Sequence, residues 1–250
     1  MEILIVAKIF FNAKLWGATA SIPVMKMLAE QAETNISRAL SDADKPGVIE
    51  SGEFQDEWHH KDGGVTTYQR TYYSYGSCVG YDEIEVKSEY KHLIAQLTRR
   101  SAFLTIFGLF EHRMVDCLEI MDHLSSKTTN KKHKTVEDCH KRLKEDFGGE
   151  NIKDIDHLSV IRNIMAHSDG TADNYKMIFS KQTKKNDAEK RLLRAIHRAN
   201  AENAGITMTI FNNVLMDETF LMYVSCEFER YIEELNTAVL TYQAQMGENH

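Results

Sequence analysis

One helical pattern runs from about Glu85 to Leu124 and constrains the fold more than any other feature of this chain. Apolar residues recur along it at alternating steps of three and four, the spacing that lines one face of an α-helix. A second long pattern of this kind begins at Leu221 and ends at Tyr242. With only two prolines in 250 residues, few helices are interrupted. The sequence predicts an all-α fold, a helical bundle with small β-hairpin additions.

The rest of the chain divides into shorter elements. Ser21-Ile22-Pro23 resembles a helix N-cap, which predicts a helix from there to about Leu40. The stretch from Glu50 to Asp82 is rich in Gly, Thr, Tyr and Ser and predicts a small hairpin or an irregular flap. Gly205–Leu215 predicts a strand or half of a hairpin. We therefore expect two parts, 1–83 as a helical segment with a β flap and 84–250 as the bundle.

Charge and cysteine spacing narrow the function classes. The net charge is −7 and the pI is near 5.9, so a wholly basic nucleic-acid coat is excluded, but a local basic patch is not. The four cysteines show no CxxC spacing, so no cysteine zinc site, metal or cofactor is expected. Without a signal-peptide core or an apolar run of about twenty residues, we expect a soluble, cytoplasmic protein with no membrane partner.

The segment Ile161–His167 carries the chemistry. It places Arg162, Asn163 and His167 within two helical turns of an otherwise apolar helix, which Asp154 or Asp156 would cap and Ser168-Asp169-Gly170 would end. Arginine is permanently cationic and presents a planar fork that suits phosphate. Histidine is the side chain whose proton moves near neutral pH. Such a pair can cleave an RNA phosphodiester without a metal.

A helical wheel separates these side chains. At about 100° per residue, Arg162 lies beside the apolar face and His167 about 140° further round, with small or polar residues between them. Asn163 precedes His167 by four positions, close enough for its amide to orient the ring. One ideal helix does not point Arg162 and His167 at the same atom. Either the helix loosens near Ser168, or a second copy supplies the missing half.

The run Arg162–Gly170 resembles the arginine, polar residue and histidine signature of HEPN domains. The layout is similar too, because a long helix containing Phe107–Glu111 precedes the motif and a long helix follows it. This resemblance covers roughly residues 85–245. Some members carry a tyrosine two residues after the histidine; this chain has Asp169 there, so no role of that tyrosine is carried over.

The resemblance implies a function. Many HEPN domains are metal-independent endoribonucleases of toxin–antitoxin or anti-phage systems, in which two domains pack around one cleft. The resemblance implies that this chain forms a homodimer that acts on RNA and is restrained by an antitoxin or regulatory protein. Arg162, Asn163 and His167 would be the catalytic residues. The products would be a 2′,3′-cyclic phosphate and a 5′-hydroxyl. The sequence does not decide whether His167 is the base or the acid.

Other interpretations of the motif stay open. His167 can cap carbonyl groups at a helix end while Arg162 pairs with a carboxylate. Some HEPN domains only bind RNA or protein, and a structural bundle can carry the motif by coincidence.

Two further features concern the site. Glu111 lies on the apolar stripe and would be costly to bury alone, so we predict that it pairs with Arg162 or Arg113, unless its helix face turns to solvent there. Lys176–Arg198 holds eight Lys and Arg against two acids. The RNA contacts predicted there are Lys184, Lys185, Arg191 and Arg194, with Tyr175 and Phe179 stacking on bases.

Overall fold

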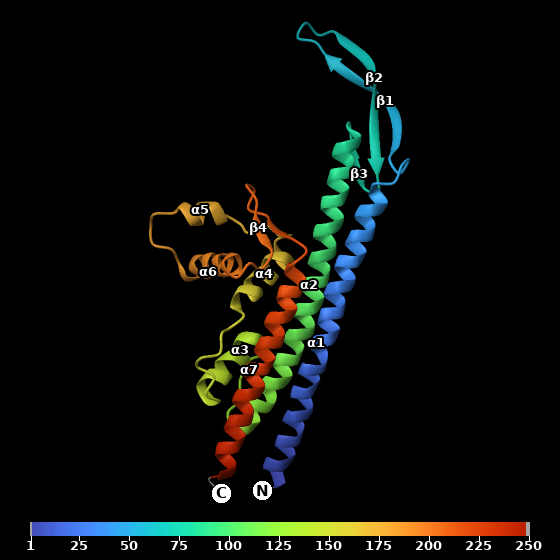
Figure 1. Cartoon of the computed structure of the whole chain (residues 1–250). Helices are drawn as coiled ribbons and strands as arrows, with labels where there is room; N and C mark the ends of the chain where they lie inside the picture. The colour runs from blue at the N-terminus through green and yellow to red at the C-terminus, as the bar shows by residue number, and fades with distance from the viewer. Residues whose placement is uncertain (1, 249–250) are drawn as a thin grey trace. The chain divides into compact units, whose positions relative to one another are not determined.

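The computed structural model describes residues 2–248, with side chains for residues 13–246. Helices dominate this range and two small antiparallel sheets accompany them, which confirms the prediction of a mostly helical fold with β additions. No helix in the described range contains a stretch long and apolar enough to cross a membrane. The elements, labelled in Figure 1, are α1 (Glu2–Ala43), β1 (Glu50–His59), β2 (Val65–Tyr75), β3 (Cys78–Gly80), α2 (Glu83–Leu124), α3 (Val136–Asp146), α4 (Asp156–His167), α5 (Tyr175–Ser180), α6 (Asp187–Ala201), β4 (Ile206–Met208), β5 (Val214–Met216) and α7 (Phe220–Glu248).

The chain forms two compact units. The first contains the chain up to Glu30 and everything from Arg100 onward, and the second contains Gln31–Arg99. This division differs from the predicted boundary between residues 83 and 84. The difference arises because α1 and α2 each contribute one part to both units.

The predicted start of the first helix at Ser21 is wrong. Helix α1 continues through this position, and Pro23 lies inside it. The Ser21 hydroxyl donates to the carbonyl of Ala18 at 2.6 Å instead of capping a new helix. Proline removes one backbone donor, yet a long helix tolerates the loss when its other face is buried. Here Ile22 and Met25 flank the proline, and both are buried.

The second unit carries the predicted hairpin. Strands β1 and β2 pair antiparallel from Glu50 opposite Ser74 to His59 opposite Val65, and β3 pairs with the end of β2. Both β-prone runs of the sequence, Val65–Tyr68 and Thr71–Tyr73, fall within β2.

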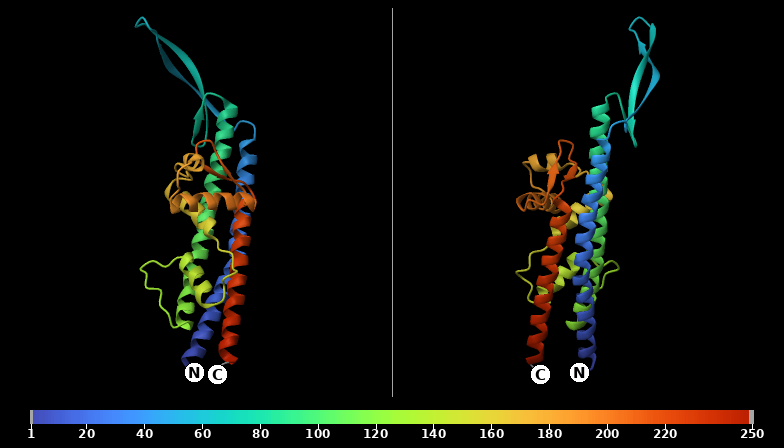
Figure 2. Two further views of the ribbon diagram at one scale, coloured as in Figure 1. Left: turned by 90° about the vertical axis from the view of Figure 1, so that its left-hand side faces the viewer. Right: turned by 45° about the vertical axis from the view of Figure 1, so that its right-hand side comes forward.

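Aromatic packing between α2 and α7 forms the centre of the first unit. Phe110 stacks on Phe228 with ring centroids 3.9 Å apart, and Phe103 meets Phe220 edge to face at 5.0 Å. All four rings are fully buried. The part of α2 after Arg100 runs alongside α7 in all three ribbon views of Figures 1 and 2. This packing fixes the α2 surface on which α4 rests.

Candidate functional site

Helix α4 carries the motif and begins beside the two acids predicted to cap it, but neither acid is its N-cap residue. Its N-cap position is Ile155, which makes no side-chain capping bond. The carboxylate of Asp154 accepts the backbone N–H of Asp156 at 3.1 Å. Of the two predicted capping acids, Asp154 therefore accepts a backbone N–H of the first turn. It does so from the position before the N-cap residue.

A tight turn ends α4 directly after the motif. Asp169 and Gly170 both have left-handed backbone angles, with φ of 50° and 82°. The Gly170 amide donates to the carbonyl of Ile164 at 3.2 Å, closing the end of the helix. Arg100 of α2 donates to the Asp169 carboxylate and, at 3.1 Å, to the Asp169 carbonyl. The predicted stop is confirmed, and α2 holds it in place.

Arg162 is held by a carboxylate of α2. Its Nη2 donates to Oε2 of Glu111 at 2.7 Å, which confirms one of the two predicted partners of that glutamate. Its Nη1 donates to the Asn163 side-chain oxygen at 2.9 Å, and the guanidinium carbon lies 5.4 Å from the centre of the Phe107 ring. The side chains of Arg162 and Glu111 are 29% and 28% exposed. The guanidinium is therefore held in a fixed orientation and remains partly exposed to solvent.

Asn163 and His167 lie on the exposed side of α4. The amide oxygen of Asn163 accepts from Arg162, so it does not orient the imidazole as the spacing had predicted. Among the described side chains, none makes a hydrogen bond with the His167 ring. The helix is regular through His167 and turns only at Ser168. The chain leaves the helix at Ser168–Gly170, where loosening was one of the two predicted alternatives, but this lies after His167 and leaves its place on the helix unchanged.

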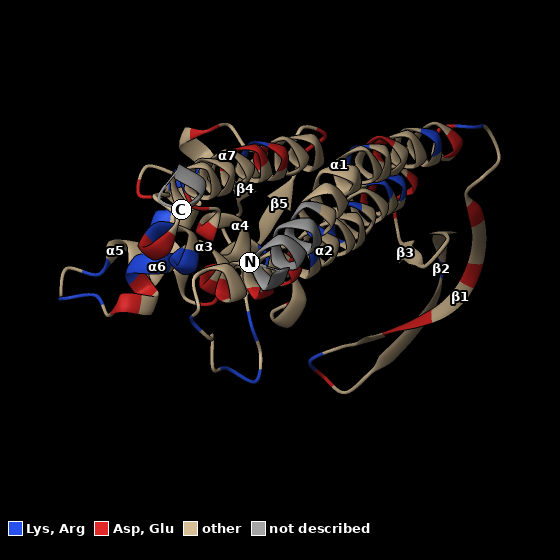
Figure 3. Ribbon diagram, turned by 90° about the horizontal axis from the view of Figure 1, so that it is seen from below, with Lys and Arg blue, Asp and Glu red and all other residues tan. Residues whose placement is uncertain are grey.

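The four predicted RNA-contacting residues differ in their surroundings. Lys184 and Arg194 are exposed, and no ion pair is found for either in the described part of the chain. The Lys185 ammonium donates to the carbonyl of Lys181 at 2.8 Å. Arg191 donates to the Asp156 carboxylate at 3.0 Å and also to Glu137, so its charge is already neutralised. The ribbon in Figure 3 marks lysine and arginine positions along α6 and along the segment between α5 and α6, with acidic positions among them.

A buried polar network lies at the other end of α4. His157 is 1% exposed, and its Nε2 lies 2.8 Å from the Tyr223 hydroxyl. That hydroxyl donates to Oε2 of Glu202 at 2.5 Å. Because the tyrosine proton is committed to the carboxylate, the hydroxyl accepts from His157, which fixes the imidazole as the neutral Nε2–H form.

Arg198 supplies the charge that this network needs. It donates to Glu202 at 2.9 Å and lies 3.5 Å from Glu227. Burial lowers the pKa of His157 to about 4, and the positive charge of Arg198 adds to the shift. Burial alone would raise the pKa of Glu202, but hydrogen bonds from Lys153, Tyr223 and Arg198 lower it to about 2. The network is therefore a set of ion pairs around a neutral histidine.

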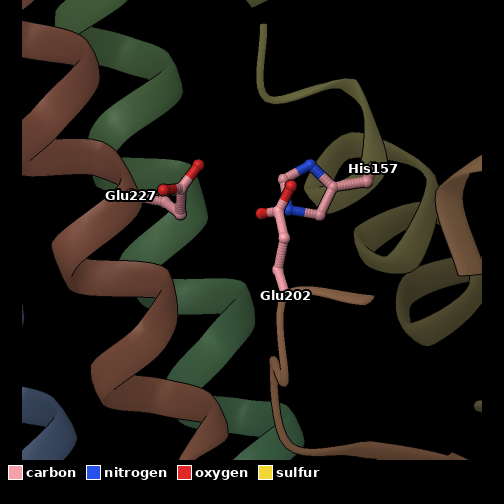
Figure 4. A group of neighbouring side chains, drawn as sticks. All are labelled: His157, Glu202 and Glu227. Atoms are coloured by element: carbon pink, nitrogen blue, oxygen red, sulfur yellow. The ribbon is translucent and has the colours of Figure 1, made fainter. Parts of the chain in front are cut away.

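The same group has a set of donors that could hold a metal. One ligand atom each from His157, Glu202 and Glu227 lie within 4.8 Å of one another, as Figure 4 shows. Nε2 of His157 and the carboxylates of Glu202 and Glu227 already have hydrogen-bond partners, from Tyr223, Arg198 and Arg230, whereas Nδ1 of His157 is buried without one. A divalent cation would have to displace the Arg198 guanidinium, which lies among the carboxylates. The donor set therefore fits an ion-pair network better than a metal centre.

Sequence reasoning missed this network. Only Asp154 and Asp156, the acids before His157, are assigned to a helix start from the sequence, and the partners of the histidine, Glu202 and Tyr223, lie far along the chain. Only the apolar residues flanking His157 signal that the ring is buried, and nothing in the sequence signals its partners.

A scan against protein-family models found no match, and searches of curated proteins and of solved structures found none either.

The buried histidine predicts a pH-dependent stability. Its folded pKa of about 4 lies below the ordinary value of 6.5, so between these two values the unfolded chain binds a proton that the folded chain does not. The stability it contributes is complete above pH 6.5 and is lost as the pH falls toward 4. From pH 7 to pH 5 we expect a loss of about 2 kcal/mol of unfolding free energy.

The substitution His157→Gln tests this by urea unfolding at both pH values. Glutamine keeps a donor near Tyr223 and cannot titrate, so the loss between pH 7 and pH 5 should be smaller in the variant. Tyr223→Phe is the matched control, because it breaks the hydrogen bond but keeps the histidine. An equal pH dependence in wild type and H157Q contradicts the assignment.

Proposed function

We propose that this protein is a metal-independent endoribonuclease of HEPN type that acts as a homodimer. The observation that carries the proposal is that α4 presents Asn163 and His167 to solvent and keeps Arg162 partly exposed, with Glu111 holding the arginine. The helical layout around α2, α4 and α7 agrees with the HEPN-like arrangement. By the same resemblance, it serves as a toxin or anti-phage effector in the cytoplasm, restrained by an antitoxin or regulatory protein.

The chemistry follows from the side chains. The 2′-oxygen of a ribose attacks the adjacent phosphorus and loses its proton to a base, while the bond from phosphorus to the 5′-oxygen breaks and that oxygen takes up a proton. The products are a 2′,3′-cyclic phosphate and a 5′-hydroxyl. Arg162 stabilises the negative charge that builds on the phosphorane oxygens. His167 carries protons.

A second copy completes the cleft. Within one regular helix, Arg162 and His167 point about 140° apart and do not converge on one phosphate. A dimer brings the arginine of one subunit to the histidine of the other, so that one guanidinium and one imidazole from different subunits meet at a single phosphate.

A surface suited to such contact exists on α1. Trp16, Val24 and Met27 are 73%, 43% and 56% exposed, and Ala20 and Pro23 continue their row. Exposed apolar rows of this kind mark interaction surfaces. This row of α1 supports a dimer. We propose that the second subunit covers it.

Replacing His167 by alanine should abolish RNA cleavage and leave the fold unchanged. His167 is exposed and its ring makes no hydrogen bond with a described side chain, so its loss removes the proton carrier with little effect on the fold. Labelled RNA is incubated with pure protein in EDTA, where wild type should cut and leave cyclic phosphate ends. His123→Ala, at another exposed histidine, is the control and should cut normally. Undiminished cleavage by H167A ends the proposal, and RNA binding without cleavage by wild type favours a non-catalytic module.

Mixing two inactive variants tests the composite cleft. Arg162→Ala and His167→Ala subunits are unfolded together and refolded, so that roughly half of the dimers are mixed. A mixed dimer keeps one arginine and one histidine on different subunits, and partial cleavage should return. Separately refolded variants combined without exchange provide the control. No recovery in mixed dimers of confirmed mass contradicts a cleft shared in this way.

Glu111 should act as a positioning residue. Glu111→Gln keeps an oxygen that can accept from Arg162 but removes the charge that holds the fork. We expect kcat to fall about tenfold with little change in KM, because the loss concerns the transition state. Glu111→Asp should restore part of the rate. Glu119→Gln, at another ion-paired carboxylate of α2, is the control. An unchanged kcat in E111Q shows that Arg162 needs no support from α2.

A further inference from the structure

A groove lies between α3, α4, α5 and α6 in the first unit. Its volume is about 1580 Å³. Its lining includes Ser159 of α4, which precedes Asn163 by four residues and so lies on the same face of the helix. It also includes Tyr175, which follows His167 by only eight residues along the chain. The groove therefore borders the beginning of α4, and Asn163 lies one turn further along the same face of that helix.

Unpaired cations line this groove from two sides. Lys144 of α3 and Arg194 of α6 are exposed, and neither has an ion-pair partner in the part of the chain that the structure describes. His197, one turn after Arg194 on α6, is exposed beside them. Cations on opposite walls suit a ligand that carries more than one phosphate.

The acids of the groove do not cancel these charges. Asp156 and Glu137 both accept from Arg191, and Asp154 accepts from Arg198 at 2.7 Å. Glu145 is the remaining acid of the lining and lies 3.8 Å from Lys141. Because these carboxylates are paired with Arg191, Arg198 or Lys141, Lys144 and Arg194 remain available.

An aromatic pair stands at one edge of the groove. Tyr175 and Phe179 of α5 lie one helical turn apart, with ring centroids 6.2 Å apart and an interplanar angle of 25°. Phe179 is 70% exposed, so its ring is open to a ligand, and the Tyr175 ring beside it is partly exposed. Unpaired bases stack on aromatic side chains of this kind.

We propose that this groove binds a single-stranded segment of RNA, with phosphates on Lys144 and Arg194 and a base on Phe179. The inference rests on the proposed function, since it names where the substrate strand lies beyond the scissile phosphate. A duplex is a poorer ligand, because its bases are already stacked on one another and cannot reach the aromatic pair. Arg191 does not contact the strand and instead fixes the groove wall through Asp156 and Glu137.

Binding of a fluorescein-labelled single-stranded oligouridylate, followed by anisotropy, tests this assignment. The protein is the full chain with His167→Ala, so that the probe stays intact. Adding Lys144→Ala and Arg194→Ala should weaken binding roughly tenfold and lower the slope of log K against log salt by about 1.4. Adding Phe179→Ala should weaken binding about tenfold with no change in that slope. All three side chains are exposed, and thermal melts check that the variants fold.

The matched control is Lys132→Ala, an exposed lysine of the first unit outside the groove. It should change affinity less than about twofold. Equal weakening by K132A and R194A, or no weakening by either groove variant, overturns the inference, as does equal competition by duplex RNA.

The cleavage assay separates the two proposals. If otherwise wild-type protein cuts RNA with the same KM when Lys144, Arg194 and Phe179 are replaced, the groove assignment fails while the nuclease stands. If wild type never cuts but the groove variants lose RNA binding, the nuclease proposal fails while the groove assignment stands.

Discussion

The ion pair between Arg162 and Glu111 is the interaction on which the candidate site depends. It joins α4 to α2 across a layer of buried aromatic rings, with the guanidinium near the face of Phe107. The ring itself packs against Phe228 of α7 at 5.8 Å. A charge pair at such an edge is less screened than one in open solvent, so it can orient a fork of donors. The arginine of the motif is thus positioned by the hydrophobic core and keeps a side open to a ligand.

The sequence predicted this pair because its signal was local on both helices. Glu111 interrupts an apolar stripe, and a carboxylate at that position needs a cation. Arg162 lies at the edge of another apolar face. The same periodicity located α2, α4 and α7, and the Gly-rich runs located the β additions. Periodicity reports which face of a helix is buried, and that was enough for these elements.

The remaining features depend on contacts that periodicity does not report. Pro23 suggested a helix start, but burial on the opposite face carries α1 through it. His157 meets Tyr223 and Glu202, residues distant in the sequence, and no local pattern predicts their meeting. From the charge of the segment alone, Arg191 and Arg194 were both predicted to contact RNA. They lie three residues apart on α6, yet one is enclosed by two carboxylates and the other lines the groove. Net charge along a segment cannot distinguish them, because the distinction is made by the acids of α3 and α4.

The rigidity of α4 constrains how any cleavage could occur. Glu111 holds Arg162 near the middle of the helix, and Arg100 holds the turn at Asp169 directly after His167. With both ends of the motif attached to α2, the helix cannot unwind to swing His167 toward Arg162 without breaking two charged contacts. Half-exposed contacts of this kind each contribute on the order of 1 kcal/mol, and the helical hydrogen bonds of the last turn add to the cost. Moving His167 to Arg162 of its own chain is therefore less favourable than placing His167 beside Arg162 of a second subunit. A catalytic role for this motif and a paired arrangement of two subunits stand or fall together.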